Sequence, residues 1–410
     1  MALGDMIDWL DIHSGQGYIW YVKRLSGNDT LANQAHQAGP YIPRSFLFAM
    51  FPVLNQPAVK NPDVRFNLYI DSHADHRLIR AVWYNNKLHG NPQNGRNETR
   101  MTGFGGASSA LLDPDSTGAL TVFAFAVDAA GVATECHVWV CRHETEEDLV
   151  EDRIGPVEPG KYVVWSPQQG TVYGLFAPPV RTNCRLAVDE IPPEWLARFP
   201  SGTEIISKAV ELRPDNGLNP DQRLIRRRDC EFDIFLSLEE AVELPVIQKG
   251  FATIDDFIAR ANSVLQRRKS RSGRSLELHT RAVFIEEGLR QGSEFDHQPE
   301  SDPGKRPDFL FPSAAHYRDS AFPAGRLRML AVKTTCKDRW RQILNEADRI
   351  PRKHLLTLQE GVSETQFKEM TDAGVQLVVP QPLVTSFPSS VQPHLQTLES
   401  FIGDVRLLGV

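Results

Sequence analysis

Three ionisable side chains in the C-terminal third of the sequence could together hydrolyse a phosphodiester. Asp308 opens one short apolar run, Lys333 follows a second, and Glu346 lies further along the chain. Such hydrolysis needs a divalent metal held by hard oxygen ligands, an activated water, and a cation near the charge that develops on phosphorus. Asp308 and Glu346 could hold the metal, and Lys333 could supply the cation.

The elements around these residues should bring them to a common edge. Residues 308–311 and 328–332 are expected to form strands, each with an ionisable residue at one end. A helix should follow, because apolar side chains recur at three- and four-residue intervals and leave Glu346 beside the buried stripe. These apolar positions are Trp340, Ile343, Leu344, Ala347 and Ile350.

Each of the three residues also has an ordinary structural explanation. Asp308 could cap a turn, and Lys333 could be an edge-strand lysine that discourages aggregation. Glu346 could pair with a nearby arginine across a helical turn. We favour the catalytic interpretation because all three residues coincide with the basic block KDRWR at residues 337–341.

This arrangement resembles the PD-(D/E)xK nuclease core, in the variant whose last acidic residue has moved onto the following helix. The run from Leu330 to Ala347, LAVKTTCKDRWRQILNEA, is similar to the catalytic region of EcoRII-type restriction endonucleases. The likeness extends over almost the whole chain. It implies that Asp308, Lys333 and Glu346 are catalytic, with Asp308 and Glu346 as the metal ligands.

Length and composition indicate a chain of two or three domains. With 410 residues, 41% hydrophobic and 24% charged, it can bury sizeable cores. No apolar run is long enough to cross a bilayer, and the N-terminus carries acids where a signal peptide would be basic, so we expect a cytoplasmic protein without a membrane partner. The five cysteines lack CxxC pairing, which argues against a zinc site or a disulfide framework.

The net charge of -7 is unfavourable for binding DNA, but the distribution of the charges matters more than their sum. Residues 266–274 form a basic run of the kind that meets a phosphate backbone, whereas residues 144–152 are acidic. A solvated face or a linker is the alternative explanation of the basic run.

The N-terminal third is expected to be a mainly β module. Runs rich in β-branched and aromatic residues alternate there with turn formers, and they are Tyr18–Leu25, Val64–Ile70, Leu78–Tyr84, Leu120–Val127 and Cys136–Cys141. Small β-barrels commonly bind through their loops, and the loop at residues 91–102 is unusually polar. In it, Arg96 and Arg100 could each bridge a guanine edge and Glu98 could accept from a cytosine amino group. A surface salt-bridge set is the alternative.

This module resembles the effector DNA-binding domain of the EcoRII-type enzymes, a pseudobarrel related in fold to a plant transcription-factor domain. The resemblance rests on Lys23-Arg-Leu-Ser26, Asn28-Asp-Thr30, His36-Gln, Gly39 and Tyr41-Ile-Pro43. It implies that Arg80, Arg96, Glu98 and Arg100 recognise bases. It also implies that His36 and Tyr41 contact phosphates. Asn94 and Thr99 stand where the family has lysines, so some affinity for the DNA backbone should be lost.

The pattern predicts a multidomain protein with a mainly-β N-terminal part and an α/β C-terminal part. The resemblance implies that the first is a DNA-binding pseudobarrel and the second a restriction-endonuclease-like (PD-(D/E)xK) domain. We expect an effector domain at residues 1–170, a linker rich in Pro, Gly and Gln at 171–193, and a catalytic domain at 194–410. In the last, helical patterns precede and alternate with strands. The expected helices are 194–199, 201–212, 230–244, 275–290 and the stretch from 363 to 374. The expected strands are 353–358 and 375–379.

Further residues are assigned by the resemblance. Glu277 corresponds to a helical glutamate beside the family's active site, although an ion pair with Arg281 would explain it equally well. Positions that match DNA-reading or DNA-contacting residues of the family are Lys337, Arg339, Arg341, Arg228 and Lys269. The last two could be ordinary surface charges.

These features predict a type IIE-like restriction endonuclease, a type II site-specific deoxyribonuclease that cuts double-stranded DNA at a CC(A/T)GG-type site with Mg²⁺. The resemblance further implies a homodimer, autoinhibition by the effector domain that a second copy of the site relieves, and a cognate DNA methyltransferase in the same restriction-modification system. Two alternatives remain open. One is a non-catalytic DNA-binding regulator, which should lack a metal ligand, and the other is a repair-type nuclease of the same fold.

Overall fold

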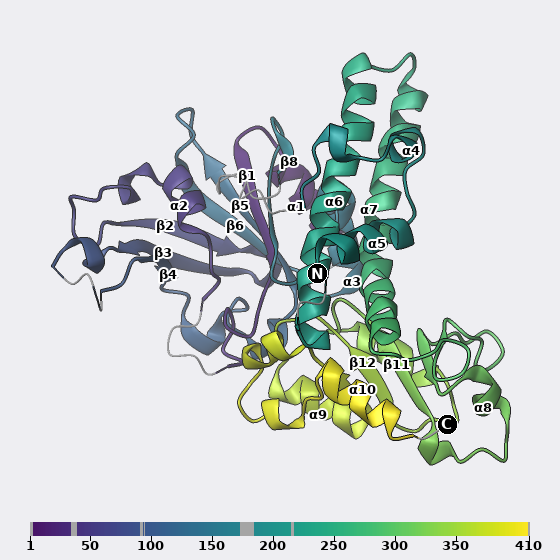
Figure 1. Cartoon of the computed structure of the whole chain (residues 1–410). Helices are drawn as coiled ribbons and strands as arrows, with labels where there is room; N and C mark the ends of the chain where they lie inside the picture. The colour runs from purple at the N-terminus through teal and green to yellow at the C-terminus, as the bar shows by residue number, and fades with distance from the viewer. Residues whose placement is uncertain are drawn as a thin grey trace. The chain divides into compact units, whose positions relative to one another are not determined.

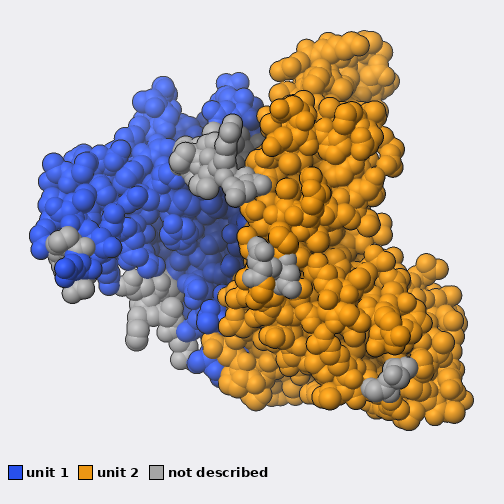
Figure 2. Space-filling view, viewed as in Figure 1, with its two compact units in different colours: residues 1–179, 359–367, 385–391 blue, residues 180–358, 368–384, 392–410 orange. Residues whose placement is uncertain are grey.

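The structure is a computed structural model in which two compact units can be described, each by itself (Figures 1 and 2). It describes residues 3–33, 39–90, 93, 95–172, 184–214 and 217–408. Unit 1 consists of residues 1–179, 359–367 and 385–391, and unit 2 of residues 180–358, 368–384 and 392–410. The domain boundaries expected from the sequence stay a prediction.

Unit 1 is built on an 8-stranded mixed sheet with the order β4-β3-β2-β6-β5-β1-β7-β8. Its neighbours are antiparallel except for β2 and β6, which run parallel. The strands are β1 (Tyr18–Arg24), β2 (Asp63–Ile70), β3 (Asp75–Tyr84), β4 (Glu98–Thr102), β5 (Leu120–Val127), β6 (Ala133–Val140), β7 (Tyr162–Ser166) and β8 (Gly170–Val172). The helices are α1 (Leu3–His13), α2 (Arg44–Met50) and α3 (Glu144–Ile154). All five predicted β runs are confirmed as strands.

The central strands of the unit 1 sheet are buried on both faces. Successive side chains of a strand point to opposite faces, and in β5 Phe123 and Phe125 enter one core while Val122 and Ala124 enter the other. The first core includes residues of α2, and the second is closed by α1 and α3. Both faces therefore hold the central strands, whereas β2, β3 and β4 alternate buried with exposed or partly exposed side chains and leave strand-face residues open to a ligand.

Unit 2 contains a 5-stranded sheet with the order β13-β12-β11-β10-β9. Its first three strands are parallel, and the β11–β10 and β10–β9 pairs are antiparallel. The strands are β9 (Asp296–His297), β10 (Phe309–Phe311), β11 (Arg328–Val332), β12 (Lys353–Leu356) and β13 (Val375–Val378). The helices are α4 (Pro193–Ala197), α5 (Gly202–Leu212), α6 (Pro220–Lys249), α7 (Ile254–Glu286), α8 (Ala314–Arg318), α9 (Glu364–Asp372), whose first residues belong to unit 1, and α10 (Leu398–Arg406). The predicted α/β character is confirmed.

The basic run at 266–274 lies inside α7 and pairs with the neighbouring helix α6. Arg267, Arg268 and Arg271 bind Glu243, Glu239 and Glu231, respectively, at 2.6–2.7 Å. These arginines hold two helices together, and the expectation that this run meets a DNA backbone stays a prediction. None of the described helices, including these two long ones, has a stretch apolar enough to span a membrane.

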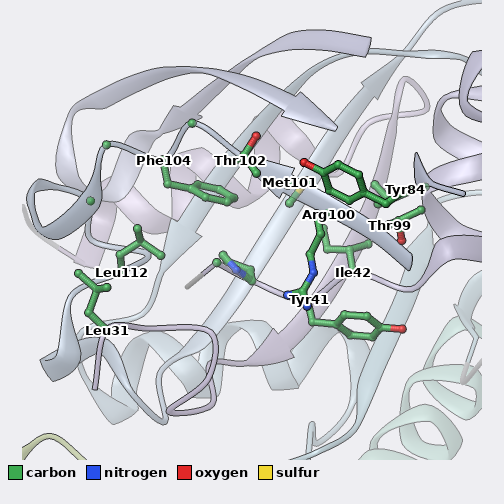
Figure 3. Close-up of a pocket in the computed structure, with 16 residues that line it drawn as sticks. Leu31, Tyr41, Ile42, Tyr84, Thr99, Arg100, Met101, Thr102, Phe104 and Leu112 are labelled. Carbon is green, nitrogen blue, oxygen red and sulfur yellow. The ribbon is translucent and has the colours of Figure 1, made fainter. Parts of the chain in front are cut away.

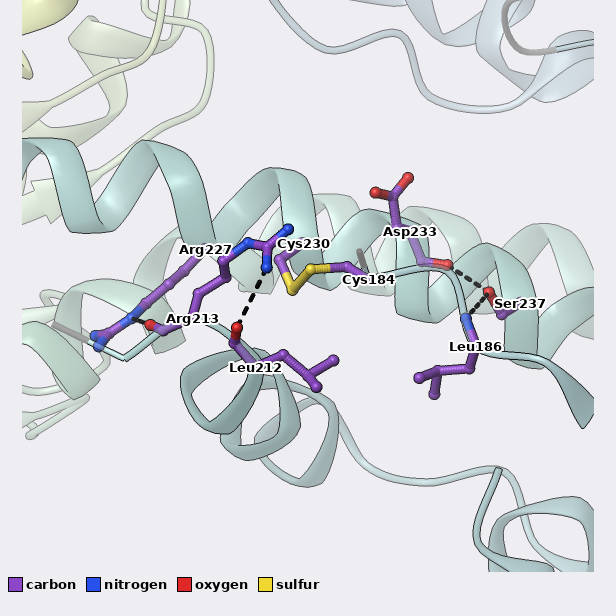
Figure 4. Close-up of a disulfide and its surroundings, with 8 residues drawn as sticks. All are labelled: Cys184, Leu186, Leu212, Arg213, Arg227, Cys230, Asp233 and Ser237. Carbon is purple, nitrogen blue, oxygen red and sulfur yellow. Dashed lines mark hydrogen bonds between the residues drawn. A yellow bond between two sulfur atoms is a disulfide. The ribbon is translucent and has the colours of Figure 1, made fainter. Parts of the chain in front are cut away.

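A disulfide joins Cys184 to Cys230 of α6 (Figure 4). The sequence argument against a disulfide was therefore wrong, because an odd set of cysteines without CxxC spacing can still contain one pair that folding brings together. The segment entering unit 2 is also held by Leu186, whose N–H donates to Ser237 Oγ at 3.1 Å. The other three cysteines, Cys136, Cys141 and Cys336, are buried and free.

Candidate active site

Two adjoining strand ends place Asp308 and Lys333 at one edge of the unit 2 sheet. Asp308 immediately precedes β10, and Lys333 immediately follows β11. Because these strands are antiparallel, with Phe309 opposite Leu330, the start of one meets the end of the other. The backbone N–H of Val332 donates to Asp308 Oδ2 at 2.7 Å and fixes the carboxylate.

Glu346 shares the electrostatic environment of these two residues. Burial raises the pKa of Glu346 to about 7, repulsion from Asp308 adds to the rise, and Lys333 and Lys353 oppose it. Burial likewise raises the pKa of Asp308 to about 6, against a backbone hydrogen bond and Lys333, and Glu277 adds to the rise. A cation bound between the carboxylates would favour the charged form of both.

The donor set fits a divalent cation of the hard class. Glu346 Oε2 is buried and accepts no hydrogen bond within the described part of the chain. A buried carboxylate oxygen without a partner is costly, so its position needs a ligand to explain it. Carboxylate oxygens are the ligands that Mg²⁺ and similar ions prefer. Asp308 and Glu346 are therefore suited to hold such an ion.

Glu346 does not lie on a helix, and this corrects the sequence prediction. The helical segment is a short 3₁₀-helix, η8 (Arg339–Asn345), and Glu346 follows it with extended backbone angles. Ala347 then takes a positive φ of 47°. Lys353 Nζ donates to the backbone carbonyls of Glu346 and Ala347. The carbonyl of Ala347 also accepts from the N–H of Ile350, three residues on, and not from the fourth residue as in a continuing α-helix. Four of the five apolar positions are buried nonetheless.

Glu277 lies in α7 with only 5% of its surface exposed and bonds to His297 of β9. The ring of His297 stacks on Phe309 of β10, 5.2 Å between centroids. The alternative partner, Arg281, donates instead to Gln291 at 2.8 Å. Glu277 thus faces the same edge as Asp308. The sequence reasoning missed His297, because a two-residue strand carries no periodic signal.

The basic block ahead of Glu346 lies on η8 and just before it. Arg341 is exposed, contacts Glu369 of α9 at 2.8 Å and lies 4.4 Å from the ring centroid of Trp340. Lys337 and Arg339 are partly exposed. A seven-residue 3₁₀ segment therefore carries Arg339 and Arg341 and is followed directly by a candidate metal ligand.

The two remaining candidates of unit 2 differ in exposure. Arg228 of α6 is buried, with 4% of its surface exposed. Lys269 of α7 is partly exposed, within the run whose arginines pair with α6. Of the two, Lys269 is better placed to reach a ligand from solvent.

In unit 1, Arg80, Glu98 and Arg100 share one face of the β3–β4 hairpin. The register sets Arg80 opposite Thr102, and residues at two-residue spacing lie on the same face. Arg80 pairs with Asp63 at 2.7 Å, and Arg100 pairs with Glu98 at 3.1 Å. These exposed pairs are weak, so either partner could exchange its contact for a ligand.

The other predicted DNA-contacting residues surround this hairpin. Arg96 lies with its guanidinium 5.5 Å from the ring centroid of Tyr84. Tyr41 is 57% exposed, and Figure 3 shows it beside Arg100 and near Thr99 at one end of a cavity of about 360 Å³, with Leu31, Phe104 and Leu112 at the other. Thr99, where the family has a lysine, is buried. His36 and Asn94 lie outside the described residues.

A second, more open cavity of about 830 Å³ collects the candidates of unit 1. Tyr41, Arg96, Glu98 and Arg100 all line it. The lining also includes residues that the sequence reasoning did not assign, and among them are Lys23, Lys161 and Glu360. Glu360 comes from the C-terminal half of the chain, which no local pattern could have linked to this cavity.

Glu360 is held in unit 1 by neighbouring backbone and side-chain contacts. The N–H of Gly27 donates to the carbonyl of Glu360 at 2.6 Å, and Ser363 Oγ donates to Asp115 at 2.6 Å. A Cβ at Gly27 would lie 2.3 Å from the carbonyl oxygen of Ser386, so only glycine permits this approach. Burial raises the pKa of the Glu360 carboxyl, and Lys23 opposes the rise.

Comparison with known proteins extends over the whole chain. The family described as Restriction endonuclease EcoRII, N-terminal, matches residues 14–169, and the family described as EcoRII C terminal matches residues 235–402. The chain is 46% identical over 407 residues to the type II restriction enzyme EcoRII of Escherichia coli, covering 99% of this chain and 98% of that protein.

Two solved structures are also similar. One is metal-depleted Ecl18kI in complex with uncleaved, modified DNA, with 19% identity, a TM-score of 0.43, and coverage of 55% of this chain and 85% of that one. The other is a UbaLAI restriction endonuclease B3 domain with cognate DNA, with 18% identity, a TM-score of 0.27, and coverage of 41% and 99%.

Proposed function

The chain belongs to the EcoRII family of type II restriction endonucleases and is a site-specific deoxyribonuclease, and from this premise we propose that it is a Mg²⁺-dependent, type IIE-like enzyme that cuts double-stranded DNA at a CC(A/T)GG-type site. The observation that carries the proposal is the meeting of Asp308, Lys333 and the unpartnered Glu346 Oε2 at one sheet edge. A non-catalytic regulator should lack one of these groups, and all three are present.

Asp308 and Glu346 would hold the metal, which supplies Lewis-acid activation of water and of the scissile phosphate when bound. Lys333 would stabilise the charge that develops on phosphorus or orient the attacking water. Glu277, fixed by His297, would act from the helix side of the same edge. The Val332 N–H fixes Asp308 and His297 fixes Glu277, and such preorganisation is what electrostatic catalysis requires.

Sequence reading is proposed to involve both units. In unit 2, Arg339 and Arg341 would reach G·C pairs in the major groove beside the cleavage site, with Lys337 close by. In unit 1, Arg80, Arg96, Glu98 and Arg100 would read a second copy, with His36 and Tyr41 at phosphates. The CC(A/T)GG-type target rests on the family likeness, and Arg228 and Lys269 would contribute further DNA contacts.

Regulation is proposed to follow from competition in the larger cavity of unit 1. Glu360 presents a carboxylate among Lys23, Lys161 and the candidate DNA-reading residues, where a DNA phosphate would be attracted by the same charges. Effector DNA would displace the segment at 359–367, which continues directly into the nuclease part of the chain. Autoinhibition of a homodimer, and protection of host DNA by a cognate methyltransferase, complete the proposed system.

The proposal is tested by incubating two plasmids with the enzyme and Mg²⁺, one with several unmethylated CC(A/T)GG sites and one with none. Discrete fragments from the first alone would support both the nuclease and its target. Cutting of both plasmids would refute the target and favour a repair-type nuclease. Intact plasmids under conditions in which the protein binds DNA would refute the proposed metal-dependent cleavage.

A further inference from the structure

A cluster of two histidines and an aspartate lies in unit 1 and includes none of the residues assigned to DNA. His13 ends helix α1, Asp71 follows strand β2 directly, and His137 lies in β6, opposite Tyr69 of β2. One ligand atom from each of the three side chains lies within 4.8 Å of the other two. We propose that these residues form a binding site for a transition-metal ion of the Zn²⁺ class.

The hydrogen bonds of the two rings leave one nitrogen of each suited to a metal. His13 Nδ1 lies 2.8 Å from the carbonyl oxygen of Trp9, and His137 Nδ1 lies 2.9 Å from Asp71 Oδ2. A carbonyl or carboxylate oxygen only accepts, so in both neutral rings Nδ1 carries the proton and Nε2 keeps its lone pair. A metal-bound histidine usually donates its other N–H to such an oxygen.

The surroundings orient the His137 ring and place a carboxylate near its Nε2. Trp9 Nε1 donates to Asp71 Oδ2 at 2.7 Å, which fixes the aspartate. Glu135 lies two residues before His137 on the same face of β6, with Oε1 3.6 Å from His137 Nε2. Tyr69 stacks on the His137 ring at 4.9 Å. An ion on Nε2 of His137 would lie on the far side of the ring from Asp71, so Asp71 orients the ring and Glu135 supplies the carboxylate ligand. Two imidazoles and one carboxylate, with a fourth position open to water, match a zinc site.

The donor chemistry separates this cluster from the proposed catalytic pair. Two imidazoles with a carboxylate suit Zn²⁺ and its first-row neighbours, whereas Asp308 and Glu346 offer only oxygen and suit Mg²⁺. His13 is 6% exposed, while Asp71 and His137 are partly exposed, so an ion could enter from solvent. A bound ion would link helix α1 to the neighbouring strands β2 and β6, and would stabilise unit 1.

Asparagine variants test the site without removing its hydrogen bonds. The amide nitrogen of asparagine takes the place of Nδ1, so His13→Asn and His137→Asn keep donors to Trp9 and Asp71 and lose Nε2. His76→Gln is the matched control, because His76 also stacks on Tyr69, at 4.7 Å, but is not part of the cluster. Asp308→Asn is the second control, since it alters only the proposed catalytic pair.

The full-length protein is stripped with a chelator and titrated with Zn²⁺ alone, by calorimetry and by metal analysis after desalting. We expect one tight equivalent per chain, a higher melting temperature with Zn²⁺, and at least about tenfold weaker binding in both asparagine variants. Both controls should bind as the parent does. The proposal is overturned if the parent binds no stoichiometric Zn²⁺, or if His13→Asn and His137→Asn bind it equally well. Because Asp308→Asn retains the ion if we are right, failure of the nuclease assignment would not affect this result.

Discussion

Lys353 donates from Nζ to the backbone carbonyl of Glu346, the residue whose carboxyl group repels that of Asp308 across the candidate metal site. It also donates to the carbonyl of Ala347 at 2.7 Å. A buried lysine of β12 therefore holds the backbone that presents a metal ligand, and it does so where the chain takes a positive φ at Ala347. Replacing Lys353 should therefore make the position of the Glu346 carboxylate less fixed, although the carboxylate itself is unchanged.

The variant Lys353→Met should lower the cleavage rate and raise the Mg²⁺ concentration needed for half-maximal activity. It removes the lysine donor from the carbonyl of Glu346, and an unsatisfied buried carbonyl costs about 1–3 kcal/mol, whereas the carbonyl of Ala347 still accepts from the Ile350 N–H at 2.9 Å. Lys305→Met is the control, because Lys305 forms an exposed ion pair with Asp348. The measurement is the cleavage rate of both variants as a function of Mg²⁺ concentration. An unchanged Mg²⁺ requirement in Lys353→Met would contradict the positioning role.

Alanine at Asp308 or at Lys333 should abolish cleavage while sparing DNA binding. Asp308 supplies a metal ligand and Lys333 a charge near phosphorus, and loss of one such group costs about 10²–10³-fold in rate. Cleavage of a plasmid and binding of an oligonucleotide that carries the site measure the two properties separately. Retained cutting by either variant would overturn the assignment.

Metal binding and cleavage should both strengthen as the pH rises through the pKa values of the two carboxyl groups, about 6 for Asp308 and about 7 for Glu346. Both values are raised from ordinary ones, so the folded protein holds these protons more tightly than the unfolded chain. The stability that they contribute is present at low pH and is lost as the pH rises through the folded values. A cation binds the deprotonated forms, so Mg²⁺ should raise the melting temperature more at about pH 8 than at about pH 5.

Glu346→Gln is the control for this pH dependence. It removes the group with the higher pKa, so the stabilisation by Mg²⁺ should become weak and nearly independent of pH above the value for Asp308. The same pH dependence in Glu346→Gln as in the parent would show that other groups cause it.

The strands of the nuclease unit were predictable from sequence because each is a short apolar run with a defined end. Residues 328–332 were predicted to be a strand and form β11, and the end of that strand puts Lys333 in place. The local conformation at Glu346 was not predictable. Its apolar neighbours have helical spacing, but the backbone there is decided by Lys353, which arrives from a different strand.

Groupings that depend on distant segments were missed for the same reason. Cys184 and Cys230 have a sequence separation of 46 and meet only because α6 packs on the incoming segment. The arginines of 266–274 looked available to DNA because their glutamate partners lie on another helix. The spacing of residues within one helix or strand can be recognised in a sequence, whereas contacts between elements become visible only in the folded structure.

Glu360→Gln should strengthen the binding of effector DNA by removing a negative charge beside Lys23 and Lys161. One charge at close range in water is worth about 1 kcal/mol, or about fivefold in affinity. Glu364→Gln is the matched control, because Glu364 lies on the same segment but is exposed and bonds to Ser390. Binding is measured in an Asp308→Ala background to prevent cleavage, and equal affinities of the two variants would contradict a role for Glu360.

A chain shortened to its nuclease part should cut DNA with a single site faster than the full-length protein, because it lacks the unit that is proposed to inhibit it. A start near Asp189 lies within the linker expected from the sequence, but it removes Cys184 and leaves Cys230 without its disulfide partner. A start at Val180 matches the first residue of unit 2 and keeps the bond. Both shortened chains also lose Asp115, the hydrogen-bond partner of Ser363.

Comparing the two starting points separates inhibition from stability. If autoinhibition holds, the chain from Val180 cuts single-site DNA faster than the parent and gains nothing from added effector oligonucleotide, whereas the parent does gain. The chain from Asp189 should show the same release with a lower melting temperature, since removing a disulfide typically costs about 2–5 kcal/mol. Equal or slower cutting by a folded chain from Val180 would count against autoinhibition, because its disulfide and its candidate catalytic residues are all retained.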